Sequence, residues 1–190
     1  MASPVNPQCL IVVDVQRAFV EGDMAVPAAD RVLAAVRTQV ASARDAGALV
    51  VHLQNDGTAE TGDEPHTWGW ELALEVREDT VIRKTADSGF DGTDLHDVLQ
   101  DRGVDAMSVC GLLSEMCVAA TVRSALALGY DVVVAHDSHA TYPVPPFRSG
   151  EPVVPADQAA RAAEWSWGDA VAIPETAERI TFSAASRSVD

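Results

Sequence analysis

The stretch Cys9-Leu10-Ile11-Val12-Val13-Asp14 is a continuous apolar run that ends on a carboxylate. It is rich in β-branched residues and shows no alternation of apolar and polar positions, which is typical of a strand buried on both faces. Such strands belong to parallel sheets that helices cover on both sides. The stretch therefore predicts the central strand layer of an α/β protein.

Strands and helices are predicted to alternate along the rest of the chain. Apolar residues recur at helical spacing over residues 27–46, and Gly47 ends that pattern. Further strands are predicted at residues 48–53, 80–84, 106–112, 131–136 and 171–173, and further helices at 91–102, 114–128 and 156–167. This alternation predicts a single domain over residues 1–190, built as a three-layer, doubly wound parallel sheet.

Composition narrows the class of protein. The 190 residues are 47% hydrophobic and carry a formal net charge of −16, which argues against binding nucleic acid or an anionic membrane. The acidity either serves solubility or steers a cationic substrate. No segment reaches the ~18 consecutive apolar residues of a membrane-spanning helix. With no basic N-terminal region, and three cysteines that form neither an even disulfide set nor a metal motif, we expect a cytoplasmic protein.

Lys84 is the single lysine of the chain, beside twelve arginines. It closes the predicted strand at residues 80–84, and open parallel sheets carry their chemistry at the carboxyl ends of strands. Arginine is a planar fork that stays charged, whereas lysine is a compact ammonium that can share a proton. Lys84 is therefore either a functional cation at a strand end or an ordinary surface lysine.

Cys117 follows another predicted strand end. Ser114 is placed to cap the helix predicted at residues 114–128, which puts Cys117 in its first turn, where the helix dipole favours a thiolate. Asp14 is placed to accept the thiol proton and Lys84 to stabilise the anion. Taken singly, Cys117 could be a packing residue, Asp14 a turn residue and Lys84 a surface residue. Together at strand ends, the three predict a nucleophilic cysteine site.

Four segments, in order along the chain, carry a family pattern. They are Val13-Asp14-Val15-Gln16 with Phe19; Lys84-Thr85 followed by Ser88-Gly89-Phe90 and Gly92-Thr93-Asp94-Leu95; Cys110-Gly111-Leu112-Leu113-Ser114-Glu115-Met116-Cys117-Val118; and residues 125–129 with Asp137 and Thr141. With these segments the chain resembles the isochorismatase-like cysteine hydrolases, which include nicotinamidases and N-carbamoylsarcosine amidohydrolase. The resemblance covers residues 10–141 and, more weakly, the C-terminal part. It places the family's Asp, Lys and nucleophilic Cys at Asp14, Lys84 and Cys117.

The resemblance implies a fold and a mechanism. The fold is a six-stranded parallel sheet of order 3-2-1-4-5-6, with a cis peptide bond between Leu112 and Leu113. The backbone N–H groups of Leu113 and Cys117 form an oxyanion hole. Cys117 attacks a carbonyl carbon while Asp14 moves the proton, and a C–N bond is cleaved through a thioester. Family members commonly assemble as dimers or tetramers, so we expect a homo-oligomer.

One departure from the family concerns metal binding. Nicotinamidases carry an Asp-x-His motif after the second strand, where this chain has Val-His-Leu-Gln-Asn-Asp at residues 51–56, and the next histidine is His66. Isolated histidines such as His52 and His66 are more often hydrogen-bonded structural residues than ligands. We therefore expect no metal and no cofactor, and an activity that survives chelators.

The substrate is expected to be a small molecule. The candidate pocket residues are aromatic: Phe19, Trp68, Trp70, Phe90 and Tyr142. Some of them have the alternative role of packing loops or a subunit interface. Acidic residues gather in the long loop at 60–71, which favours a cationic ligand. The family includes an enzyme that opens the lactam of the antibiotic streptothricin, so an amide or lactam of a basic natural product is the leading candidate.

Two other functions remain open from the sequence. One is isochorismatase-type cleavage of a vinyl ether, but that reaction needs no cysteine nucleophile, and a dicarboxylate substrate sits poorly with a charge of −16. The other is a non-catalytic binding or assembly module, which has no use for the Asp14, Lys84 and Cys117 set.

Overall fold

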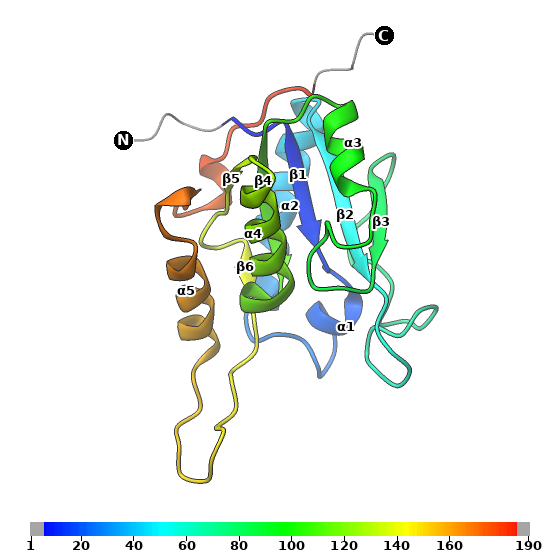
Figure 1. Cartoon of the computed structure of the whole chain (residues 1–190). Coiled ribbons are helices and arrows are strands. Elements are labelled where there is room, and N and C mark those ends of the chain that lie inside the picture. Colours follow the sequence, from blue (N-terminus) through cyan, green and yellow to red (C-terminus); the bar gives the residue numbers. More distant parts are fainter. Residues whose placement is uncertain (1–5, 186–190) are drawn as a thin grey trace.

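The computed structural model describes residues 6–185, so the first and last five residues of the predicted domain lie outside the described range. Its core is a parallel sheet in the order β3-β2-β1-β4-β5-β7, with the short strand β6 paired to β4 (Figure 1). The strands are β1 (Cys9–Val13), β2 (Leu49–Asn55), β3 (Thr80–Lys84), β4 (Ala106–Leu112), β5 (Asp131–Val133), β6 (His139–Ala140) and β7 (Val171–Ala172). The expected order 3-2-1-4-5-6 is confirmed, with β7 as the sixth strand of the path.

Helices cover both faces of the sheet, as the apolar strands require. Cys9, Ile11 and Val13 of β1 pack in one core with α3, α4 and α5, whereas Leu10 and Val12 pack in a second core with α2 and η3. The helices are α1 (Arg17–Val20), α2 (Ala29–Asp45), α3 (Leu95–Asp101), η1 (Ser114–Val118), α4 (Ala119–Ala127), α5 (Ala156–Ser166), η2 (Gly168–Ala170) and η3 (Ala177–Arg179). The three predicted layers are therefore present.

Three predicted elements differ most from those observed. The helix expected from residue 91 begins at Leu95, because the Thr93 hydroxyl accepts from the Leu95 N–H and donates to the Gly89 carbonyl, which holds a turn. The helix expected over 114–128 is divided into the π-turn η1 and the α-helix α4, with Met116 at non-helical φ and ψ of −106°. The strand expected over 131–136 ends at Val133.

Gly111 brings the carboxyl ends of β1 and β4 unusually close. It pairs in register with Val13, and its φ is +120°. A Cβ atom at this position would lie 2.0 Å from the Val13 carbonyl oxygen. Only glycine fits such an approach of two backbones. Because Asp14 follows Val13 and η1 follows β4, this contact sets the spacing between the two segments that carry the candidate site.

Two long connections leave the sheet at its carboxyl edge. The loop 56–79 joins β2 to β3, and a loop at 143–155, closed by a bridge between Val144 and Val154, extends from the body of the molecule (Figure 1). Among residues 6–185, no helix combines the length and the apolar character needed to cross a membrane.

Candidate active site

Three strand ends bring Asp14, Lys84 and Cys117 together. Asp14 follows β1, Lys84 is the last residue of β3, and Cys117 lies in η1, which follows β4. The Lys84 Nζ atom is 2.8 Å from Asp14 Oδ2 and 3.4 Å from Cys117 Sγ. Asp14 and Lys84 are 3% and 2% exposed, whereas Cys117 is half-buried. The sulfur is therefore the most accessible of the three groups, and the ion pair is buried.

The ammonium of Lys84 is held in place by two further acceptors. Its Nζ donates to Asn55 Oδ1 at 3.3 Å and to the Ala86 carbonyl at 3.1 Å. Asn55 is paired with Lys84 in the β2–β3 register, so the two strands deliver these groups side by side. A buried ammonium surrounded by acceptors is fixed in both position and charge.

Charge and burial set the protonation of this group of residues. Burial raises the pKa of Asp14 to about 6, although the neighbouring Lys84 charge acts in the opposite direction. Burial by itself would lower the pKa of Lys84, but the charge of Asp14 and the interactions with Cys117 raise it above its ordinary value. Lys84 is thus a permanent cation, and Asp14 can exchange a proton near neutral pH.

The helix dipole was expected to favour a thiolate at Cys117, but burial acts more strongly in the opposite direction. Burial, together with the charge of Asp14, raises the pKa of Cys117 to about 12, and Lys84 only partly opposes this. The resting group is a neutral thiol beside an Asp14–Lys84 ion pair. The Asp14 Oδ1 atom is buried and has no hydrogen-bond partner within residues 6–185.

Ser114 does not cap the nucleophile helix as predicted. The η1 turn has no side-chain cap, and Ser114 Oγ lies 2.8 Å from His139 Nδ1 instead. The next residue, Glu115, accepts a hydrogen bond of 2.8 Å from the Thr141 hydroxyl. His139 is in β6 and Thr141 follows it, so this two-residue strand anchors the start of the nucleophile turn.

The aromatic candidates are in different places. Phe19 and Tyr142 are half-buried against the α2 side of the sheet, and the Tyr142 hydroxyl donates to the Met24 carbonyl at 2.6 Å. Trp70 is tied down, because its Nε1 donates to Asp56 at 2.9 Å and the Arg83 guanidinium lies over its ring at 5.1 Å. Trp68 is exposed beside Arg17.

The placement of Phe90 in the pocket was wrong. Its ring stacks on Tyr130 with 6.1 Å between centroids, and Tyr130 precedes β5, at the amino edge of the sheet. The preceding residue, Gly89, donates its N–H to Thr121 of α4, so this segment runs along α4 and away from Cys117. Phe90 therefore packs, partly buried, against the core on the α4 side, at the edge of the sheet opposite Asp14, Lys84 and Cys117.

The two histidines that resemble metal ligands have other contacts. His52 is buried in β2 and its Nε2 lies 2.9 Å from Asp79 Oδ2, while His66 packs on Trp70. Within the described range, no group of three or more His, Cys, Asp and Glu side chains has the arrangement of a metal site.

Two carboxylates near the nucleophile were not predicted as site residues. Asp63 is buried and accepts a 2.6 Å hydrogen bond from Asn55 Nδ2, and its charge acts on both Asp14 and Tyr142. Asp87 Oδ1 lies 3.9 Å from Cys117 Sγ. Asn55 could have been found because it ends a strand beside Lys84. Asp63 could not, because nothing local distinguishes it from the other acidic residues of its loop.

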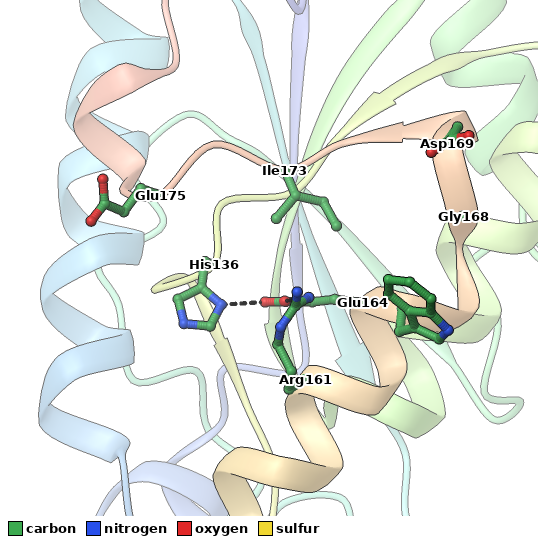
Figure 2. A pocket seen from close by; sticks show the side chains of 8 residues that line it. His136, Arg161, Glu164, Gly168, Asp169, Ile173 and Glu175 are labelled. Atoms are coloured by element: carbon green, nitrogen blue, oxygen red, sulfur yellow. Dashed lines mark hydrogen bonds and ion pairs between the residues drawn. The ribbon is translucent and has the colours of Figure 1, made fainter.

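A cavity of about 760 Å³ lies beside α5, and none of Asp14, Lys84 and Cys117 lines it (Figure 2). Its lining includes His136, Arg161, Glu164 and Trp165.

Comparisons with known proteins bear on the family and the fold. The family model of the isochorismatase domain matches residues 8–147 of the chain. Two streptothricin hydrolases from Streptomyces noursei are each 54% identical to the chain; the alignments cover 98% and 93% of this chain and 75% and 65% of those relatives. Among solved structures, a cysteine hydrolase from Pseudomonas syringae pv. phaseolicola superposes with a TM-score of 0.82 at 25% identity, over 94% of this chain and 96% of that one.

Proposed function

The chain belongs to the isochorismatase family of hydrolases, and we propose that it cleaves the C–N bond of a small amide or lactam through a thioester on Cys117. One observation carries the proposal: a buried ammonium, Lys84, lies within 2.8 Å of a carboxylate and 3.4 Å of a half-buried thiol at the carboxyl edge of the sheet. A nucleophile, a base and a fixed cation are the parts that acyl transfer needs.

In the first half of the reaction, Asp14 takes the proton of Cys117 as the sulfur attacks the carbonyl carbon. Because the pKa of Cys117 is raised to about 12, the proton moves during the attack and no free thiolate accumulates. The C–N bond then breaks as Asp14 returns that proton to the leaving nitrogen. The products are an amine and a thioester of Cys117.

In the second half, Asp14 takes a proton from water, whose oxygen attacks the thioester carbon. The C–S bond breaks, the acid leaves, and the proton returns to the sulfur. A carboxyl whose pKa is raised to about 6 suits both directions of transfer, since its proton affinity lies near the working pH. Lys84 holds Asp14 in place and offsets the charge that builds beside it.

We assign the oxyanion to the backbone N–H groups of Leu113 and Cys117, which lie on the turn that carries the nucleophile. The peptide bond between Leu112 and Leu113 is cis. Two preorganised donors of this kind stabilise a tetrahedral intermediate, and loss of one typically costs about 10²–10³ in rate.

The substrate is proposed to carry positive charge near the scissile bond. Asp87 lies 3.9 Å from the Cys117 Sγ atom, the charge of Asp63 acts on Asp14, and Lys84 is already paired with Asp14. A cationic group next to the amide would be attracted by Asp63 and Asp87, and a second anion would be repelled. Relatives named streptothricin hydrolase support a lactam of a basic natural product as the substrate.

A substrate panel tests this function. Streptothricin, simple lactams, ureides and carboxamides are incubated with the wild-type chain and with Cys117→Ala as the blank, and acid or amine release is measured. We expect wild-type hydrolysis of a cationic lactam and none by the blank. Turnover of isochorismate by both proteins, with no amide hydrolysed, would favour vinyl ether cleavage instead.

A further inference from the structure

Glu164 is a buried carboxylate outside the catalytic group. It lies in α5, is 1% exposed, and forms the inner wall of the cavity in Figure 2. On the cavity side, His136 Nδ1 approaches its Oε1 at 2.6 Å and Arg161 Nη1 approaches its Oε2 at 2.8 Å. The two basic side chains that face the cavity, His136 and Arg161, are thus already directed at Glu164. Burying a carboxylate costs desolvation free energy, so we asked what else Glu164 contacts.

The contacts of Glu164 continue inward to the nucleophile turn. His139 Nε2 lies 3.1 Å from Glu164 Oε1, and the other ring nitrogen of His139 lies 2.8 Å from Ser114 Oγ. Both His139 and Ser114 are buried. When His139 donates from Nε2 to Glu164, its Nδ1 is free to accept the Ser114 hydroxyl proton. A continuous hydrogen-bonded chain therefore joins α5 to the first residue of η1, three residues before Cys117.

Resting on the proposed function, we propose that Glu164 is a positioning residue of the cysteine nucleophile, acting through His139 and Ser114 on the η1 turn. The carboxylate fixes which nitrogen of His139 carries the proton and how its ring is oriented. His139 then fixes Ser114. Glu164 touches neither substrate nor the reacting atoms, and it differs in this from Asp14.

Packing supports the same assignment. β6 pairs with β4 at Gly111 and Leu112, immediately before the nucleophile turn, and its His139 bonds to Ser114. Trp167, just beyond α5, meets the His139 ring edge-on at 5.8 Å between centroids. The hydrogen bonds from His139 and His136 lower the pKa of Glu164 to about 2, against the effect of burial, so the carboxylate stays charged at neutral pH.

The test compares Glu164→Gln with Glu175→Gln. Glutamine keeps the volume and one acceptor oxygen of Glu164 but removes its charge and turns an amide donor toward Arg161 or His136. Glu175 lines the same cavity on the exposed side and does not bond to His139, so its variant is a matched loss of one charge. We expect Glu164→Gln to lower kcat on the order of 10²-fold, as misplacement of a reacting group does, with little change in KM. Glu175→Gln is expected to match the wild type.

A double-mutant cycle separates positioning from plain stabilisation. Ser114→Ala is expected to lower kcat, and Glu164→Gln added to it should lower kcat little further, because both act on one chain of contacts. All variants are assayed well below their unfolding temperatures. Losses that multiply, or a wild-type kcat for either single variant, would overturn the proposal. If Glu164→Gln does not fold, Ser114→Ala and His139→Gln carry the test alone.

Alkylation of Cys117 distinguishes this proposal from the proposed function. Its rate with iodoacetamide is followed by peptide mass spectrometry, with the buried Cys9 and Cys110 as internal references. Glu164→Gln should change the alkylation rate of Cys117 even if no amide in the panel is a substrate. A wild-type protein that hydrolyses no amide would overturn the proposed cleavage of a C–N bond only. An unchanged alkylation rate of Cys117 in Glu164→Gln would overturn the positioning role.

Discussion

Lys84 has more acceptors around it than its three protons can satisfy at once. Asp14, Asn55, the Ala86 carbonyl and Cys117 all lie within 3.4 Å of its Nζ atom. A compact ammonium on a flexible stem can serve a crowded, buried site of this kind. The planar guanidinium of arginine is larger and spreads its donors in a fixed fork, so it cannot occupy the same place without displacing Asp14 or Cys117.

Lys84→Arg is therefore expected to lower kcat by about 10²-fold or more while the protein remains folded. The neighbouring exchange Arg83→Lys is the matched control, because Arg83 points to the surface and pairs with Asp56. The kcat of both variants is measured, with circular dichroism and thermal unfolding as checks on the fold. A near-wild-type rate for Lys84→Arg would return Lys84 to the role of an ordinary charged residue.

The pKa of Asp14 gives the pH dependence of the reaction. Asp14 must be unprotonated in the free enzyme to accept the thiol proton, and burial raises its pKa to about 6. For a substrate that does not titrate, kcat/KM is therefore expected to rise as pH increases through about 6 and then level off. Initial rates across this range provide the measurement. A flat profile through pH 6, or a rate that falls as pH rises there, would contradict the role of Asp14.

A site residue can be predicted from the sequence when its position at the end of a strand determines where it lies in the fold. Asp14 and Lys84 end strands, and Cys117 follows one, so the parallel topology was enough to bring them together. Glu164, His139 and Asp63 come from α5, a two-residue strand and a long loop, and their contacts depend on how those segments fold back. The protonation of Cys117 was also beyond the sequence, because it depends on burial and on the charge of Asp14.

At the scale of elements, apolar patterning gave the long strands and the short strand β7 but missed β6. The bounds of β3 and β4 are those predicted, since each is a run bounded by clear breaks. β6 has two residues, too few for a periodicity, yet it anchors Ser114 and pairs with β4. The break at Met116, which divides the nucleophile segment from α4, is not visible in a sequence that favours one continuous helix.

Gly111→Ala tests the close approach of β1 and β4. The added Cβ would meet the Val13 carbonyl at 2.0 Å, and the φ of +120° is unfavourable for alanine. We expect a loss of unfolding free energy of more than about 3 kcal/mol, from overpacking and backbone strain together. Chemical denaturation of both this variant and Gly129→Ala measures it.

Gly129→Ala is the control because its φ is also positive, at +90°, but a Cβ there meets no atom of residues 6–185 within 4 Å. The loss of unfolding free energy in Gly129→Ala should be limited to backbone strain, about 1 kcal/mol. Equal losses for the two variants would show that the contact between Gly111 and Val13 does not constrain the sheet.

At the scale of the whole molecule, we propose that charge steers the substrate toward the site. The chain carries a formal net charge of −16, and Asp87 lies 3.9 Å from the Cys117 Sγ atom. For a cationic amide, kcat/KM is expected to fall as sodium chloride is raised from about 10 mM to 500 mM, because salt shortens the Debye length from about 30 Å to below 8 Å. A neutral amide of similar size is the control. If both substrates respond alike, steering by charge is not part of the function.

The covalent intermediate is the central claim, and hydroxylamine trapping tests it most directly. The wild-type chain is incubated with hydroxylamine and an amide that it hydrolyses. The hydroxamate and the free acid are both quantified, with Cys117→Ala as the blank. A thioester on Cys117 predicts that hydroxamate forms at the expense of the acid in the wild type and is absent in the variant. Acid release by the wild type with no hydroxamate, or hydroxamate formed equally by Cys117→Ala, would contradict it.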